Sequence, residues 1–90
     1  MTIQSKVNID NDVFLQEVDD ETIILNAKTQ EYFSLDEMGS IFYHFLKEED
    51  DLEIIVKELS EHFSKDEKVI ENDLVQFLKA LEEKGLVKVT

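Results

Sequence analysis

The chain contains no cysteine and no proline, and only two of its 90 residues are glycine. Without cysteine it has no disulfide framework, no thiolate chemistry and no cysteine-based zinc site. Without proline, and with so little glycine, no segment has the composition of a flexible linker. We therefore expect one domain with a single hydrophobic core, which is what a chain of this length supports.

Basic residues and long apolar runs are also scarce. The chain has 22 Asp and Glu residues against 9 Lys and Arg residues, which gives a net charge of −13. Affinity for nucleic acid and anionic lipid comes mainly from basic residues that neutralise phosphates, so both kinds of partner are disfavoured. No stretch is apolar for long enough to form a signal-peptide core or to cross a bilayer. We expect a cytoplasmic protein that does not bind membranes.

Three strand-like runs follow a polar N-terminal segment. We expect residues 1–11 to be flexible and residues 12–90 to form the domain. Alternating and β-branched residues predict strands over residues 13–18, 22–27 and 31–35, joined by short turns. This spacing predicts a three-stranded antiparallel β-meander.

From Asp36 onward the apolar residues recur at helical spacing. The pattern predicts three helices: from residue 36 to the acidic run at 47–51, over 51–63, and over 68–85. Ser34 or Asp36 is available as the N-cap of the first helix, and Gly85 stands where a left-handed C-cap is expected. Apolar residues in 86–90 favour a short closing strand. The fold class is therefore α+β, with a winged helix-turn-helix-like order of elements.

Nothing in the sequence predicts catalysis, a cofactor or a metal site. The acidic clusters fall in turns and at helix ends, so we interpret them as solvated surface. His44 and His62 lie on different predicted helices, and neither has a second His or Cys at ligand spacing. Neither a glycine-rich phosphate loop nor a nucleophile elbow is present. We expect a protein that is not an enzyme.

Other functions fit parts of the pattern. Ser34-Leu35-Asp36 is similar to the Ser-Leu-Asp of acyl carrier proteins, but Ser34 follows three strand-like runs instead of a long helix and loop. A winged-helix DNA-binding protein would read DNA with its third helix, whose four carboxylates between Ile70 and Glu83 would be repelled by phosphates. A winged-helix interaction module with some other client is a further alternative.

From Val13 to Val89 the chain resembles the PqqD-like family, small proteins or domains also called RiPP recognition elements. Members recognise the leader segment of ribosomally synthesised, post-translationally modified peptide precursors. The resemblance rests on the order and spacing of Tyr32, Leu35, Asp36, Gly39, Phe42, Asp73, Leu74, Phe77, Leu78, Leu81, Gly85 and Leu86. Asp36 replaces the Asn common in the family, a change that keeps the ability to cap a helix.

Within this family the chain looks most like the free-standing leader-binding protein of split lasso-peptide biosynthesis systems. Partners of radical-enzyme maturases are equally compatible with the pattern. The resemblance implies a non-catalytic adaptor that binds a precursor leader peptide and presents it to a leader peptidase or other maturation enzyme. The leader would add as a strand to the free edge of the strand at 31–35.

Side-chain selectivity would come from the cleft between that strand and the third helix, where the small Ala80 leaves room. We expect leader contacts from Glu31, Tyr32, Phe33, Ser34, Leu35, Val69, Asp73, Gln76, Phe77 and Ala80. Strand alternation predicts that Phe33 and Leu35 face the core. Phe77 either packs in the core or forms the floor of the cleft. Asp73 either binds a basic leader residue or solvates its helix.

Overall fold

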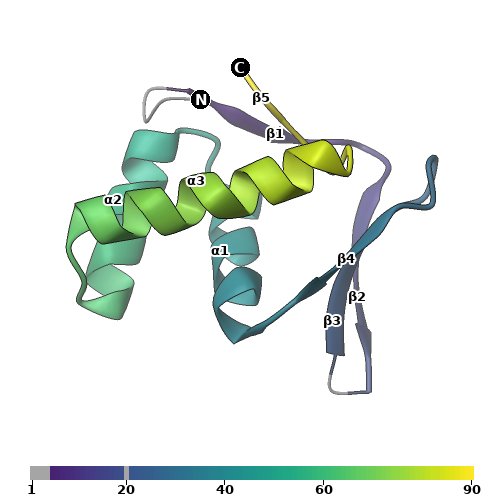
Figure 1. The fold of residues 1–90 in the computed structure, drawn as a ribbon, viewed down its shortest axis with the longest axis horizontal. Helices are drawn as coiled ribbons and strands as arrows, with labels where there is room; N and C mark the ends of the chain where they lie inside the picture. The colour runs from purple at the N-terminus through teal and green to yellow at the C-terminus, as the bar shows by residue number, and fades with distance from the viewer. Residues whose placement is uncertain (1–4, 20) are drawn as a thin grey trace.

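The computed structural model describes residues 5–19 and 21–90, and it shows two small sheets beside three helices (Figure 1). The strands are β1 (Val7–Ile9), β2 (Val13–Val18), β3 (Glu21–Asn26), β4 (Tyr32–Leu35) and β5 (Val87–Val89). The helices are α1 (Glu37–Glu48), α2 (Leu52–Phe63) and α3 (Glu67–Glu83). The predicted α+β fold, with its β-meander, three helices and short closing strand, is confirmed. In the described ranges no helix combines the length and the apolar character needed to cross a bilayer.

The meander β2–β3–β4 has β3 at its centre. Both of its pairings are antiparallel, with Phe14 opposite Leu25 and Leu25 opposite Tyr32. Asp19, before the second strand, and Gln30, before the third, have positive φ values of 57° and 65°, a conformation that tight turns require. Asp20 of the first predicted turn lies outside the described residues.

A second, two-stranded sheet joins the two ends of the chain. In it β1 pairs with β5, so that Val7 lies opposite Val89, and Val7 is only 2% exposed. The sequence patterns did not predict β1, because residues 7–9 fall within the segment expected to be flexible. A three-residue run has too little periodicity to mark a strand, and its partner lies about 80 residues away in sequence. Residues 1–4 of that segment lie outside the described residues.

Each helix is preceded by an aspartate that serves as its N-cap. The carboxylate accepts hydrogen bonds from the unpaired N–H groups of the first turn. Asp36 caps α1 by accepting a hydrogen bond from the Gly39 amide at 2.7 Å, so Asp36 and not Ser34 is the cap. Asp51 and Asp66 cap α2 and α3 in the same way. At the other end of α3, Gly85 has φ +70°, the left-handed conformation predicted for it.

The core lies where the apolar stripes of the helices meet the inner face of the meander. Its fully buried members include Ile24 from the meander and Ile55, Leu59, Ile70, Leu74, Leu78 and Leu81 from the helices. The orientation predicted for β4 is confirmed. Leu35 is buried and Phe33 is half-buried against the core, whereas Tyr32 is 59% exposed.

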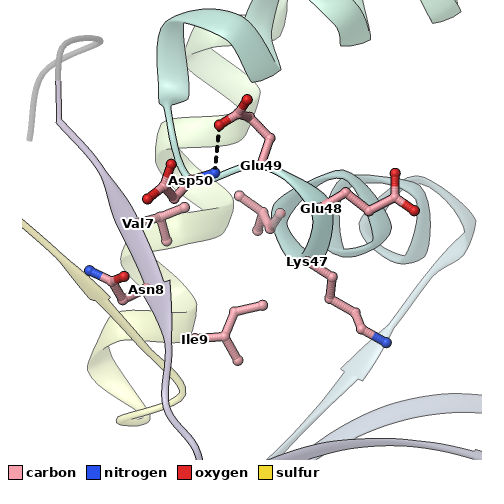
Figure 2. Close-up of a pocket in the computed structure, with 8 residues that line it drawn as sticks. Val7, Asn8, Ile9, Lys47, Glu48, Glu49 and Asp50 are labelled. Atoms are coloured by element: carbon pink, nitrogen blue, oxygen red, sulfur yellow. Dashed lines mark hydrogen bonds between the residues drawn. The ribbon is translucent and has the colours of Figure 1, made fainter.

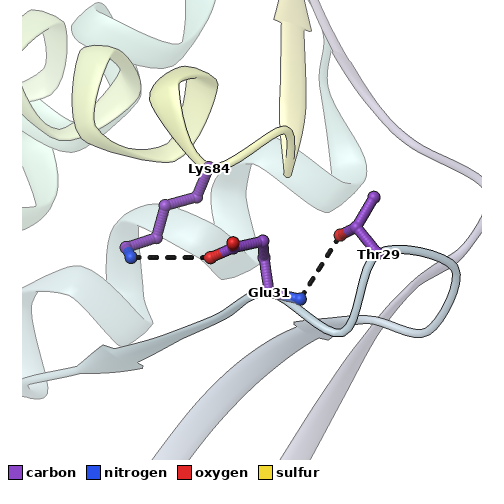
Figure 3. A network of polar contacts seen from close by, with 3 residues as sticks. All are labelled: Thr29, Glu31 and Lys84. Carbon is purple, nitrogen blue, oxygen red and sulfur yellow. Dashed lines mark hydrogen bonds and ion pairs between the residues drawn. The ribbon is translucent and has the colours of Figure 1, made fainter.

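The β3–β4 turn is attached to the C-terminal end of α3 by a buried side chain. Asn26 donates from Nδ2 to the Gly85 carbonyl at 3.1 Å, and its Oδ1 accepts from the amides of Lys28 and Thr29. Close by, the Glu31 carboxylate lies 3.7 Å from the Lys84 ammonium (Figure 3). This ion pair is exposed and contributes little to stability, so the buried amide is the main polar link.

Replacing Asn26 by Ala should lower the free energy of unfolding by about 1–3 kcal/mol, because buried donors and acceptors lose their partners. Asn26→Asp keeps the acceptor for the turn amides but sets a buried carboxylate oxygen against the Gly85 carbonyl, so it should cost at least as much as Asn26→Ala. Asn72→Ala, at an exposed site on α3, is the matched control and should change stability by no more than about 0.5 kcal/mol. Urea denaturation of the three variants measures the differences. Equal stabilities for the Asn26→Ala and Asn72→Ala variants would contradict the assigned link.

Burial raises the pKa of the Tyr43 phenol above its ordinary value of about 10. The unfolded chain therefore loses this proton at a lower pH than the folded protein does. The difference in pKa between the folded and unfolded states leaves stability unaffected below about pH 10. As the pH rises above this value, the unfolded chain ionises first and the folded protein loses stability. Tyr43→Phe should therefore flatten the fall in unfolding free energy between about pH 9 and about pH 11, measured by urea denaturation. An unchanged slope would show that other groups cause the alkaline loss.

Candidate functional site

The free edge of β4 is the first component of the candidate site. The Asn26 amide donates to the Glu31 carbonyl at 2.8 Å, which makes these two residues a hydrogen-bonded pair of the β3–β4 ladder. Antiparallel pairs alternate, so Phe33 and Leu35 also direct their main-chain groups toward β3. The N–H and C=O groups of Tyr32 and Ser34 consequently point away from the sheet. No other strand of the described chain pairs along this edge.

Two adjoining clefts lie beside this edge. One has a volume of about 300 Å³ and is lined by Phe33, Ser34, Leu35, Asp36 and Phe77. The other has a volume of about 150 Å³ and is lined by Asp36, Met38, Gly39, Phe42, Asp73, Gln76 and Phe77. Because Asp36 and Phe77 line both, the clefts form one groove that runs from β4, past the start of α1, to α3. We call this the β4–α3 groove.

Phe77 forms the floor of the groove. Its ring packs edge-to-face against Phe33 of β4, with ring centroids 6.3 Å apart, and against Phe42 of α1, at 5.7 Å. Such contacts add to the apolar burial that each ring gains. A Cβ atom on Gly39 would lie 3.2 Å from the Phe77 ring and 3.1 Å from Asp36 Oδ1, which is tighter than nine in ten real Cβ contacts. The glycine therefore allows α1 to approach the floor of the groove.

Most of the predicted site residues are brought together in the groove. Phe33, Ser34, Leu35, Asp73, Gln76 and Phe77 line it. Glu31 does not line it: this residue directly precedes β4, and its carboxylate lies 3.7 Å from the Lys84 ammonium. Tyr32 lies at the same edge, but strand alternation turns its side chain to the opposite face of the sheet.

Val69 and Ala80 are not among the lining residues. Val69 lies in the first turn of α3 and is 49% exposed, and Ala80 is half-buried nearer the other end of the helix. Conversely, Met38, Gly39 and Phe42 were not predicted as site residues. The absence of a side chain at Gly39 was the available signal, since a glycine in the first turn of a helix often marks a close approach.

The groove combines an aromatic floor, main-chain hydrogen-bonding groups and two carboxylates, Asp36 and Asp73. It contains no His, Cys or Lys. Within the described part of the chain, no group of three or more His, Cys, Asp or Glu residues is arranged to hold a metal ion. Ser34, the residue that a carrier protein would modify, lies inside β4, and its hydroxyl donates to Glu21 at 2.8 Å. Outward main-chain groups beside an aromatic floor suit recognition of an extended polypeptide.

A larger cavity of about 380 Å³ lies elsewhere, between β1 and the connection from α1 to α2 (Figure 2). Its carboxylates include Glu48, Glu49 and Asp50. The Glu49 carboxylate accepts hydrogen bonds from the Asp50 and Asp51 amides, so it stabilises the turn between the helices. We therefore assign no ligand to this cavity.

Comparison with known proteins agrees with the fold. Residues 21–87 match the family described as coenzyme PQQ synthesis protein D (PqqD). A solved structure described as TbiB1 in complex with the TbiA(beta) leader peptide is similar to this chain, with 36% sequence identity and a TM-score of 0.78. The similarity covers 89% of this chain and 93% of that one. No curated protein matches. Because the family match spans most of the residues and includes β3, β4 and all three helices, the chain belongs to the PqqD family.

Proposed function

We propose that this chain is a non-catalytic adaptor that binds the leader peptide of a ribosomally synthesised, post-translationally modified peptide precursor. The leader adds as a strand along the free edge of β4, and the adaptor presents the precursor to a leader peptidase or other maturation enzyme. Because ribosomes make the precursor, this encounter takes place in the cytoplasm. The observation that carries the proposal is the outward direction of the Tyr32 and Ser34 main-chain groups beside an apolar groove.

The comparisons support this function. The similar structure of TbiB1 contains a leader peptide. The match, at 36% sequence identity, covers nearly the whole of both chains. In the present chain an added strand would bond to the main chain of β4, which provides affinity with little dependence on sequence. Its side chains on the groove side would then meet Phe33, Phe77 and the carboxylates of Asp36 and Asp73. The main chain thus accounts for affinity and the groove for selectivity.

Ser34→Pro should weaken binding of a leader peptide at least roughly tenfold, because proline removes an outward N–H and places its ring at the edge. The pairing of β4 with β3 should survive, since the Ser34 amide takes no part in that ladder. Ser34→Ala keeps the N–H and should bind like the original chain. Fluorescence anisotropy with a synthetic leader from the neighbouring precursor gene measures the affinities.

The opposite edge of the sheet offers a matched control. The Ala27 amide donates to the Asp12 carbonyl, so by the same alternation the Glu17 amide points away from β3 along the free edge of β2. Glu17→Pro therefore makes an equivalent change on the edge that we do not assign to the leader, and it should leave the affinity unchanged. Equal effects of the two proline substitutions, or none from Ser34→Pro, would argue against strand addition at β4.

Asp73→Asn tests whether the groove recognises charge. We expect a two- to five-fold loss of affinity for a leader that carries Lys or Arg, which corresponds to roughly 0.5–1 kcal/mol for a solvent-accessible ion pair. The loss should shrink as salt is added, because salt screens the pair. Glu71→Gln, two residues away on α3 and outside the groove lining, is the charge-matched control. Identical salt dependence in the two variants would leave Asp73 with only a solvating role.

A further inference from the structure

The meander exposes an apolar row on the face that turns away from the core. Phe14, Leu25 and Tyr32 lie directly opposite one another across the three strands. The next row along, Leu15, Ile24 and Phe33, packs against the core, so alternation directs the first row outward. Phe14 is 54% exposed and Tyr32 59% exposed. Ile23 and the 53% exposed Val18 extend the same face, and we call these five residues the outer row.

An exposed apolar cluster of this kind is unusual for a chain in which 34% of residues are charged. The solvent face of an antiparallel sheet is normally polar, and contiguous apolar patches mark interaction surfaces. The charged residues of the three strands are all acidic, and the β3–β4 turn adds one basic residue, Lys28. Asp12 and Asp19 flank β2, Glu21 begins β3, and the three strands contain no Lys or Arg.

These charges identify the kind of partner. A second copy of the chain would bring a net charge of −13 and the same carboxylates against this face, which disfavours self-association. The complementary surface is an apolar centre bordered by Lys and Arg on another protein.

We propose that the outer row is the docking surface for the maturation enzyme that receives the precursor. This inference rests on the proposed function. A leader that adds beside β4 becomes the fourth strand of the same sheet, so its outward side chains continue the outer row beyond Tyr32. An enzyme on this face touches adaptor and leader together and binds the loaded adaptor in preference to the empty one. The groove lies on the other face, so docking and leader binding do not compete.

Phe14→Ser tests the surface, because Phe14 lies on β2, two strands from the edge assigned to the leader. The leader-loaded variant should bind the maturation enzyme encoded beside the precursor gene at least tenfold more weakly, as measured by calorimetry. Its leader affinity, from fluorescence anisotropy, should stay within twofold of the original. Val18→Ser should show a smaller loss of the same kind. Circular dichroism and urea denaturation establish that each variant is folded.

Ile54→Ser is the matched control, because Ile54 is 43% exposed but lies on α2, away from the sheet. It should bind both leader and enzyme normally. Added salt should slow association of the original chain with the enzyme if basic residues face the acidic border.

Enzyme binding that Phe14→Ser leaves intact, or that Ile54→Ser weakens equally, overturns the docking surface while leaving the leader site in place. A dimer of the original chain that Phe14→Ser dissociates, seen by sedimentation equilibrium, also overturns it, because the occupant would then be a second copy. Failure of the original chain to bind any leader would instead refute the proposed function.

Discussion

The packing of Phe77 between Phe33 and Phe42 is the contact on which the arrangement of the groove depends. The three rings come from α3, β4 and α1, and they meet edge-to-face. They hold the inner side of β4 to the helices through side chains and leave the main-chain groups along its outer edge free. The close approach of α1 is favoured by glycine at residue 39, because a Cβ atom there would crowd Phe77 and Asp36. An aromatic contact thus provides both the floor of the groove and the position of its open edge.

Local features of this fold could be predicted from the sequence, whereas features that depend on distant pairing could not. Helical periodicity, the aspartate at residue 36 and the glycine at residue 85 all act within one or two turns, and the structure has the predicted helices and caps. Strand β1 was not predicted, because its partner β5 lies at the other end of the chain.

The residues of the site were likewise predictable only in part. Among the residues named from the sequence, Ser34 and Phe77 line the groove but Val69 does not, since helical periodicity gives the direction of a side chain and not how far the neighbouring elements reach along the helix.

The acidity of the chain disfavours DNA binding, the function most often associated with a winged helix-turn-helix fold. The order of elements resembles a winged helix-turn-helix, in which a third helix commonly enters DNA. Here α3 presents Asp73 and Gln76 to a groove that it shares with β4, and the net charge of −13 opposes any phosphate backbone. Helix α3 occupies the position of a recognition helix, but it lines a groove instead of a DNA-binding surface. Function therefore has to be argued from the site and not from the fold.

Strand β4 has only four residues, yet it presents three chemically distinct surfaces. Phe33 and Leu35 point inward to the core and the groove, Tyr32 and Ser34 point outward, and the edge between them carries free main-chain groups. Because each surface uses different atoms, a leader on the edge and a protein on the outer face can be bound at the same time. Tyr32 belongs to two of them, through its main chain and its ring, so under both proposals we expect its substitution to alter leader binding and docking together. Phe14, on the far strand, belongs only to the outer face, and this difference allows the two functions to be separated.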